Sequence, residues 1–162
     1  MLPEFTPTRL IARLAKAGVD FVVIGGVAVV AQASPRFTKD LDITYAADTA
    51  NHERIAGVLA DVHARLRGSG EDVPFVPDAR TLSQIEILTL ETDDGGLDLL
   101  LAPAGSPAYR ELAANADAAN IDGTTFLVAS IDDLIAMKRA AGRPQDLIDI
   151  ESLEVAKRLS GE

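Results

Sequence analysis

Two carboxylates stand two residues apart in the chain, Asp40 and Asp42, and an apolar run follows them. Because successive side chains of a β-strand point to opposite faces, both acids would project from one face with Cα atoms roughly 6–7 Å apart. That spacing suits two magnesium ions about 3.5–4 Å apart. Asp98 opens another apolar run and would add a third carboxylate if the two strands are neighbours. Three buried like charges are costly unless a cation neutralises them, so the group is a candidate metal site.

Two glycines, Gly25 and Gly26, end the apolar run 21–24 and precede a short, apolar, helix-like segment. Glycine lets a phosphate approach the backbone closely, and the first turn of a helix offers free N–H groups and the positive end of the helix dipole. A tight strand-to-helix turn explains the same glycines equally well. A P-loop is excluded, because no Gly-Lys-Ser/Thr follows.

Basic and hydroxyl side chains lie in the loop that leads into the two acids, at Arg36, Thr38 and Lys39. They are placed to reach phosphate oxygens, and a solvated loop is the alternative interpretation. Lys138 lies at the border of the apolar side of the helix predicted over 131–141. From there its ammonium group could extend along the apolar surface toward a neighbouring site.

Other ionisable residues have simpler explanations. Arg143 and Asp146 are one helical turn apart and could form a local ion pair. His52 and His63 fall on the helix predicted over 49–66, away from the other candidates, so we predict exposed side chains with no metal role. The remaining pairs of adjacent acids are typical of turns and helix caps.

Apolar periodicity predicts the elements that would position these groups. An Asp/Gly turn at 93–96 between two apolar runs indicates an antiparallel hairpin, and Ser130 with Asp133 fits a capping box. Predicted helices cover 8–17, 27–32, 49–66, 109–114, 131–141 and 145–159, and predicted strands cover 19–24, 41–45, 85–90, 97–101 and 125–128, with another beginning at 79–80 and a loop over 68–77. The order indicates an α+β fold with a mixed, largely antiparallel sheet flanked by helices. We expect one domain, 1–162, in which a C-terminal helical pair (129–162) packs on an α/β core (1–128).

Composition bounds the function. The chain has 162 residues, 48% of them hydrophobic, and a net charge of −10, which disfavours binding of extended DNA through its phosphate backbone. Without cysteine there is neither a disulfide nor a thiolate metal site. No basic-then-apolar leader is visible and no apolar run could span a bilayer, so we expect a cytoplasmic protein that does not bind membranes.

The segment Asp40-Leu41-Asp42-Ile43-Thr44 also resembles the nucleophile motif of haloacid-dehalogenase-like phosphatases. In that motif the aspartates end a hydrophobic strand. Here polar residues precede the acids and apolar residues follow them, so the acids begin the strand. The direction of the strand therefore argues against a phosphatase, while an isolated pair of strand-end acids with no function remains open.

Taken together, Gly25-Gly26, the pair at 40 and 42 and the later Asp98 resemble the DNA polymerase β-type nucleotidyltransferase superfamily. Within it, the chain is most similar to the AbiEii-like group of bacterial toxin–antitoxin and phage-defence systems. Residues 36–42 resemble that group's Arg-x-Ser/Thr-x-Asp-Leu-Asp signature, and residues 133–149 resemble its C-terminal Lys…Lys-Asp-x-x-Asp motif.

The resemblance implies a nucleotidyltransferase fold and magnesium-dependent transfer of a nucleoside monophosphate from an NTP to a hydroxyl of RNA, tRNA included, or of a protein. It also implies a cognate toxin or antitoxin as partner. It implies metal ligation by Asp40, Asp42 and Asp98, which with Lys138 and Asp146 would be the catalytic residues. Lys138 and Arg36 would stabilise phosphate charge, and Asp146 would orient the lysine or the acceptor. The residues implied to bind the nucleotide are Gly25, Gly26, Arg36, Thr38 and Lys138.

Two departures from the group's pattern leave an alternative open. Gln145 stands where the group often has lysine, and the long helical C-terminal extension of many relatives is missing. Acceptor recognition would then come from a partner or from a compact surface. The alternative is a nucleotide- or partner-binding module of the same fold whose chemistry has lapsed.

Overall fold

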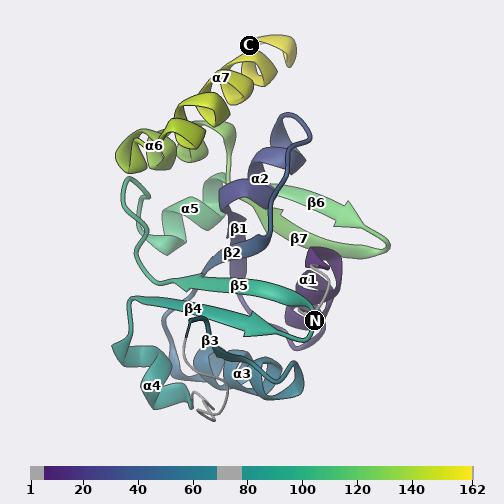
Figure 1. Ribbon diagram of the computed structural model, residues 1–162, viewed down its shortest axis with the longest axis vertical. Helices are drawn as coiled ribbons and strands as arrows, with labels where there is room; N and C mark the ends of the chain where they lie inside the picture. The colour runs from purple at the N-terminus through teal and green to yellow at the C-terminus, as the bar shows by residue number, and fades with distance from the viewer. Residues whose placement is uncertain (1–5, 69–77, 162) are drawn as a thin grey trace.

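Seven strands form one mixed sheet in the order β3-β4-β5-β2-β1-β7-β6 (Figure 1). The computed structural model describes residues 6–68 and 78–161. The helices are α1 (Pro7–Lys16), α2 (Gly25–Gln32), α3 (Thr49–Asp61), α4 (Ala79–Gln84), α5 (Tyr109–Asn115), α6 (Ile131–Ala141) and α7 (Pro144–Leu159). The strands are β1 (Phe21–Ile24), β2 (Asp40–Tyr45), β3 (Arg65–Leu66), β4 (Ile87–Thr92), β5 (Gly95–Leu100), β6 (Asp117–Ile121) and β7 (Thr124–Val128).

Strands β1 and β2 lie near the middle of the sheet, between β5 and β7. All four residues of β1 are buried, as expected for a continuous apolar run covered on both faces. On β2 the residues that alternate with the acids, Leu41 and Ile43, have no exposed surface. Leu10 and Leu14 of α1 are also fully buried, and each such side chain contributes about 1.5–3 kcal/mol. The start of β2 is therefore held by a well-packed core.

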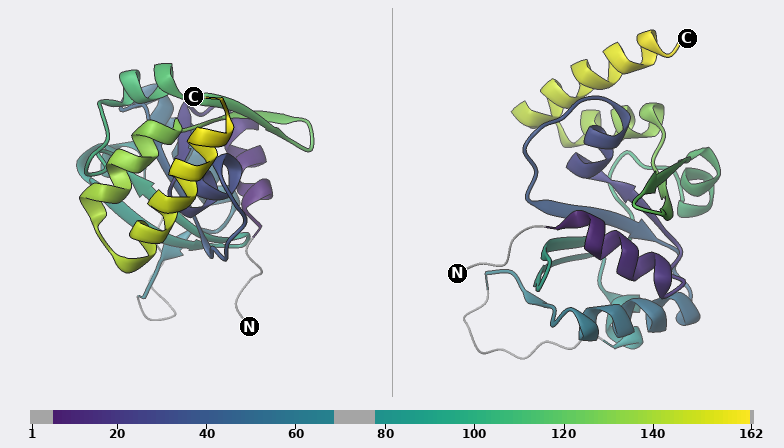
Figure 2. Two further views of the ribbon diagram at one scale, coloured as in Figure 1. Left: turned by 90° about the horizontal axis from the view of Figure 1, so that it is seen from above. Right: turned by 90° about the vertical axis from the view of Figure 1, so that its right-hand side faces the viewer.

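Helices α6 and α7 pack against each other and against α2 at one end of the molecule, and α3 with α4 lies at the opposite end (Figures 1 and 2). The Oγ atom of Ser130 accepts a hydrogen bond from the backbone N–H of Asp133 and caps the start of α6. Gly142, with φ of 64°, ends α6 in the left-handed conformation that glycine adopts freely. A sharp turn therefore brings α7 back beside α6.

The predicted fold class is confirmed. Four of the six strand pairings are antiparallel, and the β4–β5 hairpin closes at the Asp/Gly turn as expected. Helices flank the sheet and a helical pair ends the chain. The strand that carries the paired acids begins at Asp40, so the first acid lies within the strand.

Several predicted boundaries were wrong. The helix expected over 49–66 ends at Asp61, because the chain turns at His63, whose φ is 52°, and residues 65–66 then form β3. Residues 79–80 begin helix α4 and no strand, since the side chain of Asp78 caps that helix. Strand β6 was not predicted; none of its residues is fully buried, and it is defined by its pairing with β7. Beyond Gly68, the predicted loop 68–77 lies outside the described residues.

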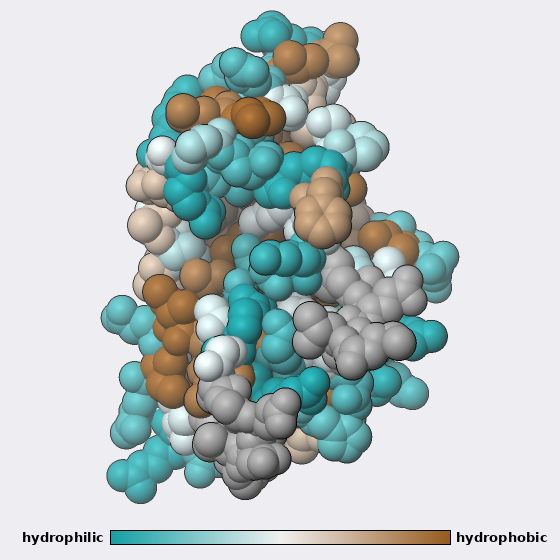
Figure 3. Space-filling view, in the orientation of Figure 1, coloured by the Kyte–Doolittle hydropathy of each residue, from teal (hydrophilic) through white to brown (hydrophobic). Residues whose placement is uncertain are grey.

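The face of the molecule between the C-terminal helices and the sheet is largely hydrophilic, and brown, hydrophobic patches lie on the C-terminal helices at the top and beside strands β4 and β5 at the lower left (Figure 3). Exposed apolar side chains of α7 include Leu147, Ile148 and Leu159. Among the described residues, no helix is long and apolar enough to cross a membrane.

Candidate active site

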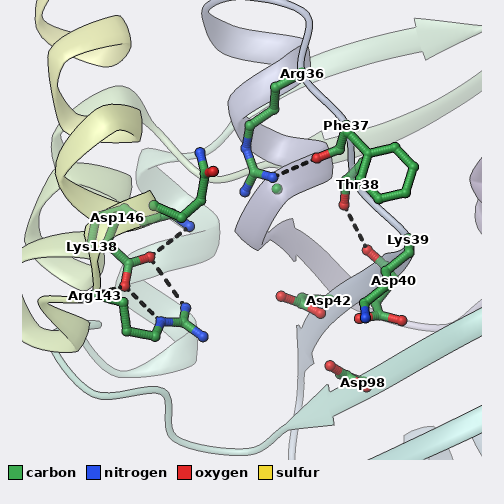
Figure 4. A pocket seen from close by; sticks show the side chains of 12 residues that line it. Arg36, Phe37, Thr38, Lys39, Asp40, Asp42, Asp98, Lys138, Arg143 and Asp146 are labelled. Atoms are coloured by element: carbon green, nitrogen blue, oxygen red, sulfur yellow. Dashed lines mark hydrogen bonds and ion pairs between the residues drawn. The ribbon is translucent and has the colours of Figure 1, made fainter.

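Strand pairing brings the candidate carboxylates together. Strands β2 and β5 are parallel neighbours, and their register sets Asp42 directly beside Asp98 and Asp40 beside Gly96. Figure 4 shows Asp40, Asp42 and Asp98 on one side of a pocket. Three acids that are separated by up to 58 positions in the chain thus meet because the hairpin β4–β5 places its second strand against β2.

The pocket collects polar groups from three parts of the chain. The carboxylates come from the sheet, a second group comes from the loop that precedes β2, and a third comes from the C-terminal helices (Figure 4). Its lining residues are Gly26, Arg36, Phe37, Thr38, Lys39, Asp40, Asp42, Asp98, Lys138, Arg143, Gln145 and Asp146. All but Gly25 of the site residues expected from the sequence therefore line one pocket.

The carboxylates on the sheet are electrostatically strained. Burial, followed by repulsion from Asp98 and Asp40, raises the pKa of Asp42 to about 7. Burial also raises the pKa of Asp98, although the nearby guanidinium of Arg67 opposes this shift. The Oδ1 atom of Asp42 is buried and has no hydrogen-bond partner in the described part of the chain. A hard divalent cation prefers carboxylate oxygens as ligands and would supply the partner that this buried atom lacks.

Carboxylate oxygens are suitable ligands for such a cation, but the three side chains are not arranged to coordinate one together. Among the described residues, no group of three or more His, Asp or Glu side chains is positioned to hold a metal ion as it stands. Arg67 accounts for part of this, because its Nη2 atom lies 3.2 Å from Asp40 Oδ1 and 2.9 Å from Asp98 Oδ1. A cation bound by all three acids would have to share them with this guanidinium.

The two glycines after β1 make room for side chains of the site. Gly25 has φ of 69°, and a Cβ atom there would overlap the carboxylate of Asp42. At Gly26 a Cβ atom would come within 2.8 Å of both Arg36 Nη2 and Thr38 Oγ1. Helix α2 begins at Gly25 with no side-chain cap. Gly25 itself does not line the pocket, whereas Gly26 does.

A chain of ion pairs crosses from the loop before β2 to helix α7. Arg36 Nε lies 2.9 Å from Asp149 Oδ1, and Lys138 Nζ lies 2.9 Å from Asp149 Oδ2 and 3.2 Å from Asp146 Oδ1. Arg143 Nε completes the chain, 2.7 Å from Asp146 Oδ2. Both aspartates are almost fully buried, with side chains 1% exposed. Buried charges of this kind are stable only while they are paired.

This network has the opposite electrostatic effect from the sheet carboxylates. Burial alone would raise the pKa of Asp146, but hydrogen bonds from Arg143 and Lys138 outweigh it and lower the pKa to about 2. The side chain of Asp146 also accepts the backbone N–H of Arg143, so the expected local pair is part of a helix cap. Lys138 is not a border residue of the helix, because it is 7% exposed and enclosed by the two aspartates.

Sequence reasoning missed the roles of Asp149 and Arg67. Asp149 lies one turn after Asp146, so the spacing i, i+3 could have indicated that both acids share a buried helix face. Gln145 donates a hydrogen bond to it, 2.9 Å from Asp149 Oδ1. Arg67 has no comparable signal, because its position depends on the pairing of β3 with β4.

The expected exposure of the histidines is half wrong. His52 is 4% exposed, with its ring packed edge-on against Tyr45 at 5.9 Å between centroids. It lies one turn before the buried Ile55, a spacing that already places it on the apolar face of α3. His63 is exposed beside Asp93, as expected, but it lies beyond the end of α3.

Solved structures confirm the fold. The lincosamide antibiotic adenylyltransferase LnuA, bound to lincomycin, superposes with a TM-score of 0.61 at 14% identity, over 93% of this chain and 98% of that one. ANT(2'')-Ia in complex with adenylyl-2''-tobramycin gives 0.56 at 16% identity, over 93% and 84%. An antigenic nucleotidyltransferase-like protein from Paracoccidioides brasiliensis gives 0.56 at 17% identity, over 89% and 71%.

The sequence itself identifies the family. No curated protein matched the chain. The profile of the family described as "Nucleotidyl transferase AbiEii toxin, Type IV TA system" matches residues 9–156, which include every candidate site residue. The chain therefore belongs to the AbiEii nucleotidyltransferase family.

Proposed function

We propose that the chain moves a nucleoside monophosphate from an NTP to a hydroxyl of an RNA or protein acceptor, in a reaction that requires magnesium. The observation that carries the proposal is the arrangement of charges within one pocket. Three carboxylates on β2 and β5 face cations from the preceding loop and from helix α6. Such a pocket offers one side to a divalent cation and the other to a triphosphate.

The carboxylate side would hold the metal. Asp40, Asp42 and Asp98 are the ligands, and magnesium, when bound, supplies Lewis-acid stabilisation of phosphate charge. The unpaired Oδ1 atom of Asp42 supports this assignment.

The opposite side would hold the phosphates. Arg36 and Lys138 are fixed in advance by their shared partner Asp149, so little reorganisation is needed when they stabilise phosphate charge. Thr38 and Gly26 line the same pocket, and Gly25 shapes it from beneath by making room for Asp42. Asp146 would orient Lys138, to which it is bonded.

In the transfer step, the acceptor oxygen attacks the α-phosphorus and forms the new P–O bond, while the bond to pyrophosphate breaks. We assign Asp98 as the carboxylate that takes the proton of the acceptor hydroxyl, since burial raises its pKa and so makes it a stronger base. Arg36 and Lys138 stabilise the negative charge on the transferred phosphate and on the departing pyrophosphate.

The family description supports a place in a type IV toxin–antitoxin system with a cognate toxin or antitoxin as partner. RNA, tRNA included, or a protein is the acceptor class we propose, in the cytoplasm. The net charge of −10 favours a local engagement of the acceptor end over binding along a nucleic-acid backbone. Two of the structural neighbours are bound to lincomycin and to adenylyl-2''-tobramycin, so small hydroxyl compounds belong in the acceptor screen.

One observation favours a second candidate, a binding module without chemistry. Gln145 takes a position where a further cation would face the phosphates, and its amide is engaged by Asp149. The module would bind MgNTP through the same pocket without transferring the nucleotide.

The test is transfer of α-³²P label from each of the four NTPs to cellular RNA, to protein and to small hydroxyl compounds, with and without magnesium. We expect labelled acceptor only with magnesium, and none with Asp40→Ala. Asp61→Asn, which changes an exposed acid at the end of α3, is the matched control and should transfer label normally. Tight binding of MgNTP by calorimetry with no labelled acceptor would favour the module, and neither binding nor transfer would refute both.

A further inference from the structure

Arg67 crosses the sheet to reach the catalytic carboxylates. It follows β3 at the edge of the sheet, yet its guanidinium passes β4 and ends between two acids on β5 and β2. The Nη2 atom lies 2.9 Å from Asp98 Oδ1 and 3.2 Å from Asp40 Oδ1. No other basic side chain in the described residues forms an ion pair with either acid.

Contacts with β4 fix this guanidinium. Its Nε atom donates to Glu91 Oε1 at 3.0 Å, and Nη2 donates to the backbone oxygen of Leu90 at 2.9 Å. The backbone N–H of Arg67 donates to the oxygen of Thr89, which extends the β3–β4 pairing by one residue. The side chain is 29% exposed. These contacts with β4 fix the conformation of the Arg67 side chain, unlike that of a solvated arginine.

Gly96 provides the space in which the guanidinium meets the acids. A Cβ atom at this position would lie 2.7 Å from Arg67 Nη2 and would overlap the Oδ1 atom of Asp40. The φ angle of Gly96 is not positive, in contrast to that of Gly95 in the turn, so it is space that requires glycine here. Gly95 therefore allows the turn, whereas Gly96 allows the close approach of Arg67 and Asp40.

We propose that Arg67 is a resident cation of the carboxylate cluster, occupying the place between Asp40 and Asp98 that one of two divalent ions would otherwise take. The site then holds a single divalent ion, with Asp42, the acid that forms no ion pair with Arg67, as its main ligand. This inference rests on the proposed function and narrows it from a two-metal to a one-metal, one-arginine site.

Both the space between the two acids and their charge favour a single divalent ion. A magnesium ion must lie 2.0–2.1 Å from its oxygen ligands, and a nitrogen that contacts both Asp40 Oδ1 and Asp98 Oδ1 stands where an ion bridging these two atoms would have to be. The guanidinium stays protonated at all working pH values, and the two acids raise its pKa further against the opposing effect of burial. It therefore offsets one of the three negative charges permanently.

The first experiment uses Mn²⁺ alone, with binding followed by the EPR signal of the free ion. Arg67→Gln and Arg67→Met, the second of which keeps the aliphatic stem, should bind Mn²⁺ at least about tenfold more tightly than the wild type, because a competing charge within 3–4 Å is gone. Arg65→Gln removes an exposed arginine of the preceding strand β3 that forms no ion pair with any described residue, and is the matched control, with unchanged affinity. Equal affinity in both Arg67 variants and the wild type would overturn the proposal.

The second experiment adds the α,β-methylene analogues of the NTPs, which cannot release pyrophosphate. The bound wild type should give the EPR spectrum of isolated Mn²⁺, and the Arg67 variants should give the halved hyperfine spacing of a coupled pair about 3.5–4 Å apart. A coupled pair in the wild type, or no pair in either variant, would overturn the proposal. If no analogue binds at all, the proposed function fails, while the Mn²⁺ titration still decides the role of Arg67. Thermal unfolding of each variant verifies that it folds.

Discussion

Two groups of acids face each other across the pocket, and they are neutralised to very different extents. Asp146 and Asp149 on α7 share three cations, Arg36, Lys138 and Arg143, through contacts of 2.7–3.2 Å. Of the three acids of the sheet, Asp40 and Asp98 share one guanidinium, that of Arg67, and Asp42 forms no ion pair within the described residues. The result is a pKa lowered to about 2 for Asp146 and raised to about 7 for Asp42.

This difference separates scaffold from reaction centre. The α7 group is a completed network that ties the C-terminal helices to the loop before β2, and its cations are thereby aimed into the pocket. The sheet group has one guanidinium for three carboxylates, so its excess negative charge is costly until a further cation binds. The aspartates of α7 are fully paired and therefore stabilise the structure. The aspartates of the sheet are not, and can therefore bind a further cation.

The largest expected effect is on activity at the sheet group. Asp42→Asn removes a metal ligand while keeping the shape of the side chain, so we expect transfer to fall by about a thousandfold or more. The same change also removes an unpaired buried charge, and the metal-free variant should unfold at or above the wild-type temperature at pH 8. Label transfer and thermal unfolding are the two measurements. A large loss of stability would contradict the proposed strain.

The α7 group should respond in the reverse way. Asp149→Asn leaves Arg36 and Lys138 without their shared buried partner, so the free energy of unfolding should fall by about 3 kcal/mol. Urea unfolding at pH 7 measures the change. Glu151→Gln, on an exposed position of the same helix, should leave the midpoint within experimental error. A similar small effect of both substitutions would mean that the network is not structural.

The two groups should also oppose each other in pH dependence. Asp42, with a folded pKa near 7 against an ordinary 3.8, contributes stability that is fully present below about pH 4 and is lost as pH rises to 7, by about 1 kcal/mol per pH unit. Asp146, with a folded pKa near 2, contributes stability above about pH 4 that is lost as pH falls to 2.

Metal-free unfolding between pH 4 and 8, compared with that of Asp42→Asn, isolates the first contribution. The variant should lack the decline between pH 4 and 7, and saturating magnesium should remove it from the wild type. Parallel pH profiles of the two proteins would contradict the raised pKa.

The smallest expected change is a shift in tryptophan fluorescence emission. The chain has no tryptophan, and Phe37 at the rim of the pocket is 83% exposed, so Phe37→Trp introduces a single tryptophan, which can be excited selectively at wavelengths longer than those that tyrosine absorbs, without disturbing the core. Its emission should shift when MgNTP is added and should not shift when the same addition is made to the Phe37→Trp, Asp42→Asn double variant. An identical response of both proteins would place nucleotide binding elsewhere.

Local sequence patterns were sufficient to predict the three carboxylates of the sheet, but not to predict Arg67 as their counterion. Asp98 was recognisable because an Asp/Gly turn and two apolar runs define the hairpin that carries it. Arg67 was not, since two residues of β3 leave no periodic signal and the contact spans two further strands. His52 was misjudged although its spacing from Ile55 indicated burial. The pairing of Arg36 with Asp149 joins residues 113 positions apart and could be found only from the folded chain.

The proposed role of Asp40, Asp42 and Asp98 is to support transfer of a nucleotidyl group. It is tested most directly by measuring labelled acceptor and released pyrophosphate together in one reaction with α-³²P-labelled NTP, magnesium and the acceptor found in the screen. We expect one pyrophosphate per labelled acceptor for the wild type and neither product for Asp42→Asn. Release of orthophosphate in place of pyrophosphate, or equal transfer by wild type and Asp42→Asn, would contradict it.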